Sequence, residues 1–363
     1  MHRAVVSIAL LLSAFSGSRA NAEEPLGTLK VDPVALITGN EVPGQETLAL
    51  EYQHYRYLFA NEENLAKFKK DPSRYEIQLG GACGSMGVLS GRGTPDLFAV
   101  HDSKIYIFAS EGCRERFLSM PEQLLQPPDK RPEVSEDALA AGETLLSKML
   151  QGVGGQSAVS SIKNFRRTIK KQVESGGQTY AYQQWNMCAV DGSVRRETKW
   201  DDDTWVSVAS KNTGFFQSAS SNDWMAPVQS AALRREMFNH SVLGILLSRE
   251  RGDFIAVSTG TAEIAGEAAA LLTVYFDETT TTLAVDTETG RVLQLSYQGP
   301  GPGAVIGELT HTFADFEEIH GLMLPRSAEV TFNGEPFAHS SYSLADLGVN
   351  EDYPPTIFDR PEK

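Results

Sequence analysis

After Gly155 the chain consists largely of short runs in which apolar and polar residues alternate. In residues 291–297, Leu293, Leu295 and Tyr297 would share one face, because successive strand side chains point to opposite sides. Similar runs cover residues 164–173, 178–188, 194–200, 204–209, 269–276, 281–286, 308–316, 328–333 and 338–344. Glycine-containing turns separate many of them. About ten strands, with helices before them and near residues 227–249, predict an α+β fold whose curved antiparallel sheet wraps around helices.

Residues 126–136, QPPDKRPEVSE, divide the chain into two parts. Three prolines and alternating charges leave little to bury, so we interpret residues 128–137 as a linker. This predicts one domain over residues 23–127 and another over 138–363, independent of each other by default. Ser135 is placed to cap a helix that glycines end after Val153.

An internal repeat with an offset of 49 residues lies before the linker. It aligns YLFANEENLAKFKKDP with YIFASEGCRERFLSMP, so that Phe59, Phe68 and Pro72 match Phe108, Phe117 and Pro121. Each unit is predicted to form a short strand, a turn and a helix with an acidic first turn. Such small units need each other, or a metal, to form a core.

Residues 28–125 resemble the YHS family, in the opening Asp32-Pro33-Val34, the segment 71–75 (DPSRY) and the segment 80–83 (GGAC). The resemblance implies a metal site of three cysteines per unit. Ala35, Ala60 and Asn64 occupy those places in the first unit, which implies that its site is lost. In the second unit Cys83 and Cys113 fill two places and Ala109 the third.

Cys83 and Cys113 have three interpretations. Two thiolates make a poor zinc or copper site, although His101, Met86 or Met120 would complete a soft ligand set for a metal ion. In an exported protein a Cys83–Cys113 disulfide is the preferred alternative, and unpaired thiols are the third. His101 alone is also explained as a surface loop residue beside Asp102.

Residues 138–361 resemble the LolA-like superfamily of periplasmic lipoprotein carriers. The resemblance lies in the glycines after the first helix, in DTETGRV (286–292), in FEEIHGLMLP (316–325) and in the tail 354–361. It implies a half-barrel whose cavity holds a lipid or a lipidated client. Trp185, Trp205 and Phe238 are candidates to line that cavity, with ordinary core packing as the alternative. The helix around 233–247 is either a lid or a static core helix.

The first 22 residues predict export. A basic start precedes an apolar run at 4–15, and Ala20-Asn21-Ala22 suits signal peptidase, so cleavage is expected near Ala22 and a periplasmic or secreted location follows. Later segments are too short or too polar to span a membrane. The formal net charge of −15 argues against nucleic-acid binding.

The residues favour binding over catalysis. The chain contains no His-Glu-x-x-His, no Gly-x-Ser-x-Gly and no phosphate-binding glycine loop. We therefore expect a non-enzymatic binding protein that holds a hydrophobic ligand, with the YHS-like domain as an interaction module for an envelope partner. A metal-binding or metal-sensing protein that uses Cys83 and Cys113 is one alternative, and a structural scaffold of an envelope complex is another.

Overall fold

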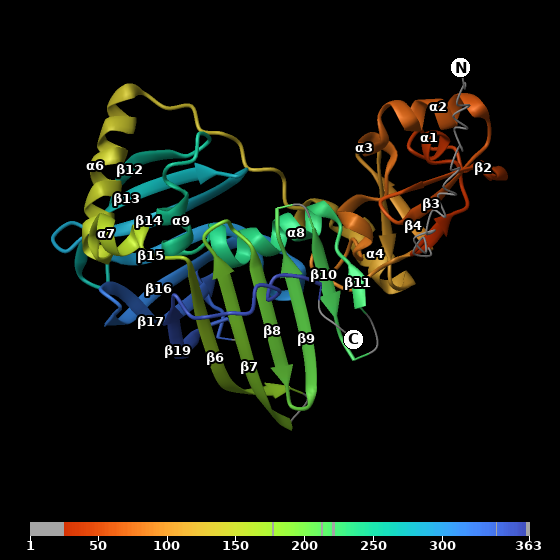
Figure 1. The fold of residues 1–363 in the computed structure, drawn as a ribbon. Coiled ribbons are helices and arrows are strands. Elements are labelled where there is room, and N and C mark those ends of the chain that lie inside the picture. The colour runs from red at the N-terminus through yellow and green to blue at the C-terminus, as the bar shows by residue number, and fades with distance from the viewer. Residues whose placement is uncertain (1–24, 176–177, 212, 220–221, 339, 361–363) are drawn as a thin grey trace, which may run out of the picture.

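The computed structural model describes residues 25–175, 178–211, 213–219, 222–338 and 340–360. The predicted signal peptide, residues 1–22, lies outside this range. Figure 1 shows a smaller N-terminal part, in red and orange, beside a large curved sheet. Within the described residues, each helix is too short or too polar to cross a membrane.

The N-terminal part is built from two copies of one unit. The first copy comprises β2 (Gln45–Tyr52), β3 (Tyr55–Phe59), α2 (Glu62–Lys70) and α3 (Pro72–Tyr75), and the second comprises β4 (Thr94–His101), β5 (Lys104–Phe108), α4 (Glu111–Ser119) and α5 (Pro121–Leu124). Every element of the second copy begins 49 residues after its counterpart, as the sequence repeat predicts. The first strand of each hairpin was not predicted. A short β1 (Gly27–Leu29), α1 (Pro33–Leu36) and the 3-10 helix η1 (Gln78–Gly81) complete this part.

The helix caps repeat as well. The side chains of Asn61 and Ser110 accept hydrogen bonds from the backbone N–H groups of Asn64 and Cys113, respectively. Both caps satisfy a donor that the first helical turn leaves unpaired. Whether these units belong to the YHS family stays a prediction.

The two units share their apolar core. Phe68 and Phe117 are fully buried at equivalent positions. Ile105 and Ile107 of the second unit pack in the cluster that surrounds Phe68. Each unit therefore supplies apolar surface that the other covers, as expected for units too small to fold alone.

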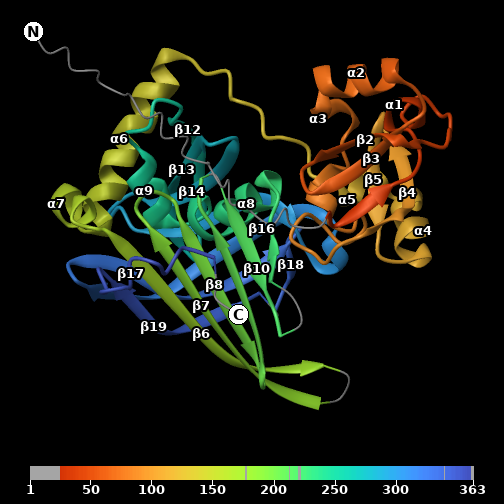
Figure 2. The ribbon, with the colours of Figure 1, turned by 45° about the vertical axis from the view of Figure 1, so that its right-hand side comes forward.

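The C-terminal part contains a 14-stranded antiparallel sheet that curves without closing. Its strands are β6 (Asn164–Ser175), β7 (Gln178–Ala189), β8 (Val194–Trp200), β9 (Asp203–Ala209), β10 (Gly214–Gln217), β11 (Asn222–Trp224), β12 (Ile255–Ile264), β13 (Glu267–Phe276), β14 (Thr279–Asp286), β15 (Val292–Pro300), β16 (Ile306–Ile319), β17 (Leu322–Phe332), β18 (Glu335–Pro336) and β19 (Tyr342–Val349). β19 joins two wings, since it pairs with β6 on one side and β17 on the other. Figure 2 shows the wing of β6–β11 folded toward the wing of β12–β17.

Helices fill the concave side of this sheet. They are α6 (Glu136–Val153), α7 (Gly155–Ser160), α8 (Pro227–Arg234), the π-helix η2 (Arg235–Asn239) and α9 (Val242–Ser248), with a 3-10 turn η3 (Pro302–Ala304) between strands. Ser135 caps α6 through the N–H of Ala138, as predicted. The helix predicted near 227–249 is interrupted at His240, after which Ser241 caps α9.

Strands β10, β11 and β12 were not predicted. In β12 the residue pairing with β13 shifts between Ser258 and Gly260, and Gly260 has φ 140°. A bulge of this kind breaks the period-two alternation on which the prediction depends. β10 and β11 have only four and three residues, too few to establish a pattern.

The two parts touch each other, contrary to the expectation of independent domains. The guanidinium of Arg92 donates to the Trp224 carbonyl at 3.1 Å and lies 3.4 Å from the Asp223 carboxylate. The His54 ring packs on Trp224, with ring centroids 4.2 Å apart. The linker is also anchored, because the Asp129 carboxylate accepts from the Thr280 N–H at 2.6 Å. Proline content alone does not reveal such contacts.

Candidate functional site

A cavity of about 560 Å³ lies between the wings of the large sheet. β6, β7 and β8 form one wall, β15, β16, β17 and β19 form another, and η2 with the start of α9 crosses between them. The loop Met86–Ser90 of the N-terminal part also contributes to the lining. The cavity therefore draws on both parts of the chain.

Strand alternation determines which side chains of β6 and β7 line this space. The lining residues are Phe165, Arg167, Ile169 and Lys171 of β6 and Tyr182, Gln184 and Asn186 of β7. Trp185 lies between Gln184 and Asn186 in the sequence, so its side chain is on the opposite face. Trp185 is therefore one position along β7 from the residues that line the cavity, and its side chain points away from it.

None of the three aromatic residues predicted to line the cavity is part of its lining. Trp205 of β9 pairs with Thr198 of β8, on the face that Gln184 and Arg196 share, but it is not among the residues that line the cavity. Phe238 is buried in the main core, where its ring lies 6.2 Å from that of Phe165. For Phe238 the core-packing alternative therefore describes its position.

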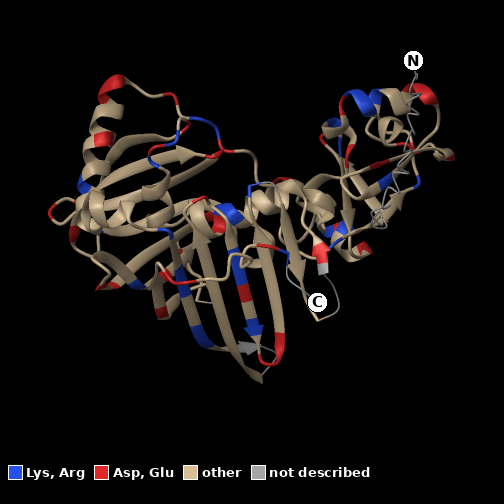
Figure 3. Cartoon of the chain, viewed as in Figure 1, with Lys and Arg blue, Asp and Glu red and all other residues tan. Residues whose placement is uncertain are grey.

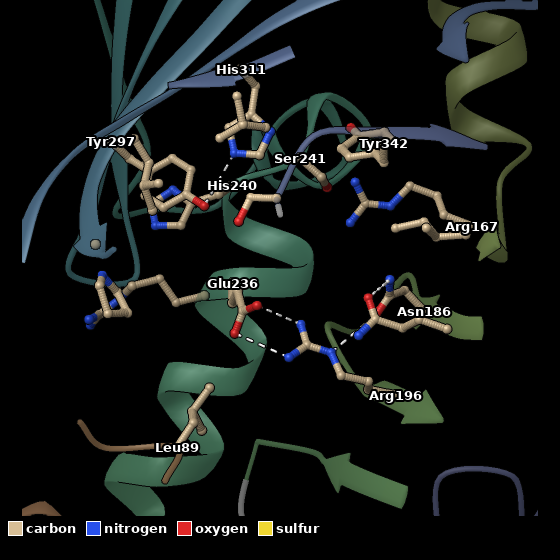
Figure 4. Close-up of a pocket in the computed structure, with 18 of the residues that line it drawn as sticks. Leu89, Arg167, Asn186, Arg196, Glu236, His240, Ser241, Tyr297, His311 and Tyr342 are labelled. Atoms are coloured by element: carbon tan, nitrogen blue, oxygen red, sulfur yellow. Dashed lines mark hydrogen bonds and ion pairs between the residues drawn. The ribbon is translucent and has the colours of Figure 1, made fainter. Parts of the chain in front are cut away.

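Three polar side chains form a row across the cavity wall. Arg167, Asn186 and Arg196 face one another through the register of β6, β7 and β8. The Arg196 guanidinium donates to both carboxylate oxygens of Glu236 on η2, at 2.8 and 3.3 Å, and its Nε donates to Asn186 at 3.2 Å. Figure 4 shows this network reaching into the cavity. Arg196 is thus held in place and neutralised.

Arg167 is bound differently. One of its Nη atoms donates to the Met237 carbonyl at 3.3 Å, and its guanidinium lies beside the Tyr342 hydroxyl. Its Nε is buried without a hydrogen-bond partner. Within the described residues, no carboxylate lies within 4.0 Å of this guanidinium. Figure 4 shows the group pointing into the space across from Glu236 and Ser241.

A stack of rings lies beside these charges. The rings of His240 and Tyr297 are parallel with centroids 3.7 Å apart, and His311 lies next in line at 5.8 Å from Tyr297. His240 shares a hydrogen bond of 2.8 Å with the Thr281 hydroxyl. Burial, together with a smaller effect of the positive charge of Arg167, lowers the pKa of His311 to about 4. The pKa of His240 also lies well below its usual value, mainly because of burial. Both imidazoles are therefore neutral near pH 7.

Comparisons with known proteins identify no family for this chain. No family model matches it, and no curated protein matches it. Among solved structures, a DUF1329 family protein from Desulfovibrio piger aligns at 12% identity over 61% of this chain and 97% of its own, with a TM-score of 0.41. A LolA superfamily protein from Nitrosomonas europaea aligns at 11% identity over 60% and 96%, with a TM-score of 0.39. A putative outer membrane lipoprotein-sorting protein domain from Vibrio parahaemolyticus aligns at 8% identity over 61% and 97%, also with a TM-score of 0.39.

Much of the remaining cavity surface is apolar. Apolar lining residues include Phe165, Ile169, Val242, Leu243, Leu309, Phe313, Leu324, Val330, Leu344 and Leu347. The lining also contains four basic side chains, Arg167, Lys171, Arg196 and Arg235, and one acidic side chain, Glu236. The cavity thus combines apolar walls with a group of cations, an arrangement suited to an amphipathic molecule.

The predicted metal-site residues lie elsewhere, in the second N-terminal unit. Cys83 and Cys113 are free thiols close enough for a hydrogen bond between them. His101 instead belongs to a group with Asp102 and Glu122, whose ligand atoms all lie within 4.8 Å of one another. Burial raises the pKa of the Cys83 thiol, which opposes formation of a thiolate ligand. Both the disulfide and the metal role stay predictions.

Sequence reasoning missed the charged residues of the cavity. The basic residues Arg166, Arg167, Lys170 and Lys171 of β6 were not among its candidate site residues. In the structure Arg166 pairs with Glu351 and Asp346, each at 2.6 Å, while Arg167 and Lys171 line the cavity. A usable signal was present, because Phe165 and Ile169 share the phase of Arg167 and Lys171.

Proposed function

We propose that this chain is an exported, non-enzymatic binding protein whose large sheet holds one hydrophobic ligand, a lipid or a lipidated client. The cavity of about 560 Å³ carries this proposal. Its size falls within the roughly 300–1,000 Å³ common for small-molecule sites. Burial of an acyl chain against its apolar wall would contribute about 0.8 kcal/mol per methylene.

The surroundings of the cavity hydroxyls and imidazoles support binding rather than catalysis. The Ser241 hydroxyl accepts from the Gly244 N–H and donates to the Phe238 carbonyl, so it serves as the cap of α9. The neighbouring His240 binds Thr281 through Nδ1. A nucleophile needs a base within hydrogen-bond reach, and these contacts give both groups structural partners instead.

Native mass spectrometry of the protein purified gently from its source tests the proposal. We expect a bound small molecule that denaturation releases. Ile169→Trp would fill the cavity, whereas Lys170→Trp, one position along β6, would place the same side chain on the exposed face. The proposal predicts that the first variant loses the ligand and the second keeps it. A ligand-free wild-type protein, which also fails to take up added fatty acid, would contradict it.

The N-terminal part would act as an interaction module in this proposal. Its loop Met86–Ser90 lies at the cavity, and the Val88 carbonyl accepts from the Gln229 side chain of α8 at 3.2 Å. A partner bound to this part would therefore sit next to the ligand. Export is proposed from the first 22 residues, and the N-terminal sequence of the purified protein tests it.

A metal-binding protein remains the second candidate, favoured by the proximity of the Cys83 and Cys113 thiols. Metal analysis of the purified protein and of Cys113→Ser separates the two functions. Bound metal that disappears in this variant, with no released lipid, would support the second candidate.

A further inference from the structure

We propose that the ligand of the cavity carries an anionic group, a carboxylate or phosphate, and that the Arg167 guanidinium binds it while the apolar walls enclose the rest of the molecule. This inference rests on the proposed function and specifies the chemistry of the ligand. The occupant is therefore an anionic amphiphile.

The contrast between two arginines in one row is the first observation. Arg196 faces a carboxylate that binds it at two points, and Asn186 satisfies its Nε. Arg167, two strands away in the same row, meets only a carbonyl and a phenol, and its Nε has no partner. A guanidinium has five donors in a planar fork that matches carboxylate and phosphate oxygens. Among the described residues of this row, Arg167 is the cation that no carboxylate within 4.0 Å neutralises, and its Nε is open to a ligand.

The charge of the wall is the second observation. Lys171 lies on the same face of β6, and Arg235 lines the cavity from η2. Within the described residues, Arg235 has no carboxylate within 4.0 Å either. Charges held partly away from water attract counter-charge more strongly than charges on the surface. An anion entering the cavity would therefore be stabilised by more than one cation.

This concentration of positive charge is unusual for the chain. The protein has a formal net charge of −15. In Figure 3 the basic residues of β6 and β8 form bands on the strands that build one wall of the cavity. A basic cavity inside an acidic protein favours an anion whose burial is itself favourable. Burial of an acyl chain contributes this favourable free energy.

The position of Arg167 indicates an amphiphile rather than a small free anion. Phe165 and Ile169 flank it on the same face of β6. An anionic group bound at the guanidinium would thus have apolar surface on both sides along the strand. A free phosphate would leave that surface without a partner.

A panel of chain-matched probes tests the inference by calorimetry on the full mature chain. Dodecanoate and monododecyl phosphate carry an anionic group, dodecanol is neutral, dodecyltrimethylammonium is cationic, and inorganic phosphate lacks the chain. All are used below their micelle concentrations and above neutral pH. We expect both anionic amphiphiles to bind at least about tenfold more tightly than dodecanol, and inorganic phosphate to bind weakly.

Variants then locate the anion. Arg167→Gln should weaken dodecanoate binding by about tenfold to a hundredfold while leaving dodecanol binding unchanged, and Arg167→Lys should keep most of the affinity. Arg195→Gln is the matched control, because Arg195 lies on the outer face of β8, where it pairs with Glu197 at 2.6 Å. Thermal unfolding of each variant checks that it is folded. The comparison of the probes on the wild-type protein stands even if a variant does not fold.

The outcomes separate the two proposals. If no amphiphile binds, the proposed function fails. If dodecanol and dodecanoate bind equally, or if Arg167→Gln leaves their ratio unchanged, the anionic site is refuted while the hydrophobic carrier stands. If inorganic phosphate binds as tightly as dodecanoate, the occupant is a small anion and the amphiphile is refuted.

Discussion

Arg196 on β8 and Glu236 on η2 form a two-point ion pair that ties the helix to the strand wall. The shorter contact, between Nη2 and Oε1, is 2.8 Å. The pair occupies one side of the cavity and removes one positive charge from it. The pair therefore affects both the stability of the contact between η2 and β8 and the net positive charge that the cavity presents to a ligand.

Replacement of Glu236 should separate these two effects. Glu236→Gln would leave Arg196 without its counter-charge, so we expect the free energy of unfolding to fall by about 1–2 kcal/mol. The same change releases a second guanidinium toward the cavity, so dodecanoate should bind more tightly. Chemical unfolding and calorimetry measure the two quantities. Arg196→Gln serves as the comparison, since it should lower stability without raising affinity.

The repeated N-terminal units should depend equally on their equivalent phenylalanines. Phe68 contacts the rings of Tyr57 and Phe59, and Phe117 contacts those of Tyr106 and Phe108, at centroid distances of 4.8–5.3 Å. Phe68→Ala and Phe117→Ala should each cost about 3–5 kcal/mol, because both side chains are fully buried.

Because the two units share a core, the loss of stability caused by either variant should extend to both units. Because Ile105 and Ile107 pack around Phe68, either variant should loosen both units together. Amide hydrogen exchange over residues 25–125 measures this effect. Leu118→Ala is the control, since Leu118 is exposed beside Phe117. Loss of protection confined to one unit would contradict the shared core.

The half-buried imidazole of His311 should make stability depend on pH. Its pKa is lowered to about 4 in the folded chain, mainly by burial, against about 6.5 in an unfolded chain. Between about pH 7 and about pH 4 the unfolded chain takes up a proton there that the folded chain does not, so the free energy of unfolding decreases as pH falls. His311→Asn should reduce this decrease by about 1–3 kcal/mol.

Denaturant unfolding at a series of pH values measures this difference. Glu76 contributes in the opposite sense, because burial raises its pKa to about 7, but it is present in both proteins and cancels in the comparison. His320→Asn is the matched control, since His320 is exposed at a turn. Equal pH profiles for wild type and His311→Asn would show that His311 does not carry the effect.

The three cysteines should differ in reactivity. Cys188 is fully buried, and burial raises the pKa of its thiol to about 12, so iodoacetamide should modify it only after unfolding. Cys113 is partly exposed and adjacent to Cys83. If these two form the preferred disulfide in the exported protein, neither should react until a reductant is added. Peptide mass mapping with and without reductant checks each site.

Several elements of this fold were predictable because their causes are local. The cap at Ser135 depends on one side chain and the N–H of Ala138. The repeat is visible because Phe68 and Phe117 have equivalent surroundings. Strands β6, β7 and β8 were recognised from alternation, and their observed bounds lie within two residues of the predicted ones. β12 was missed because the bulge at Gly260 interrupts that alternation.

The sequence by itself determined which residues of a strand share a face, and the tertiary structure decided which face encloses the cavity. Both faces of β6 carry cations: Arg166 and Lys170 lie on one, and Arg167 and Lys171 on the other. Period-two alternation separates these pairs but does not say which of them meets solvent. That depends on the curvature of the sheet and on where η2 and α9 pack, which arise from contacts between residues far apart in the chain. The pairing of Arg196 with Glu236, 40 residues later, has the same origin.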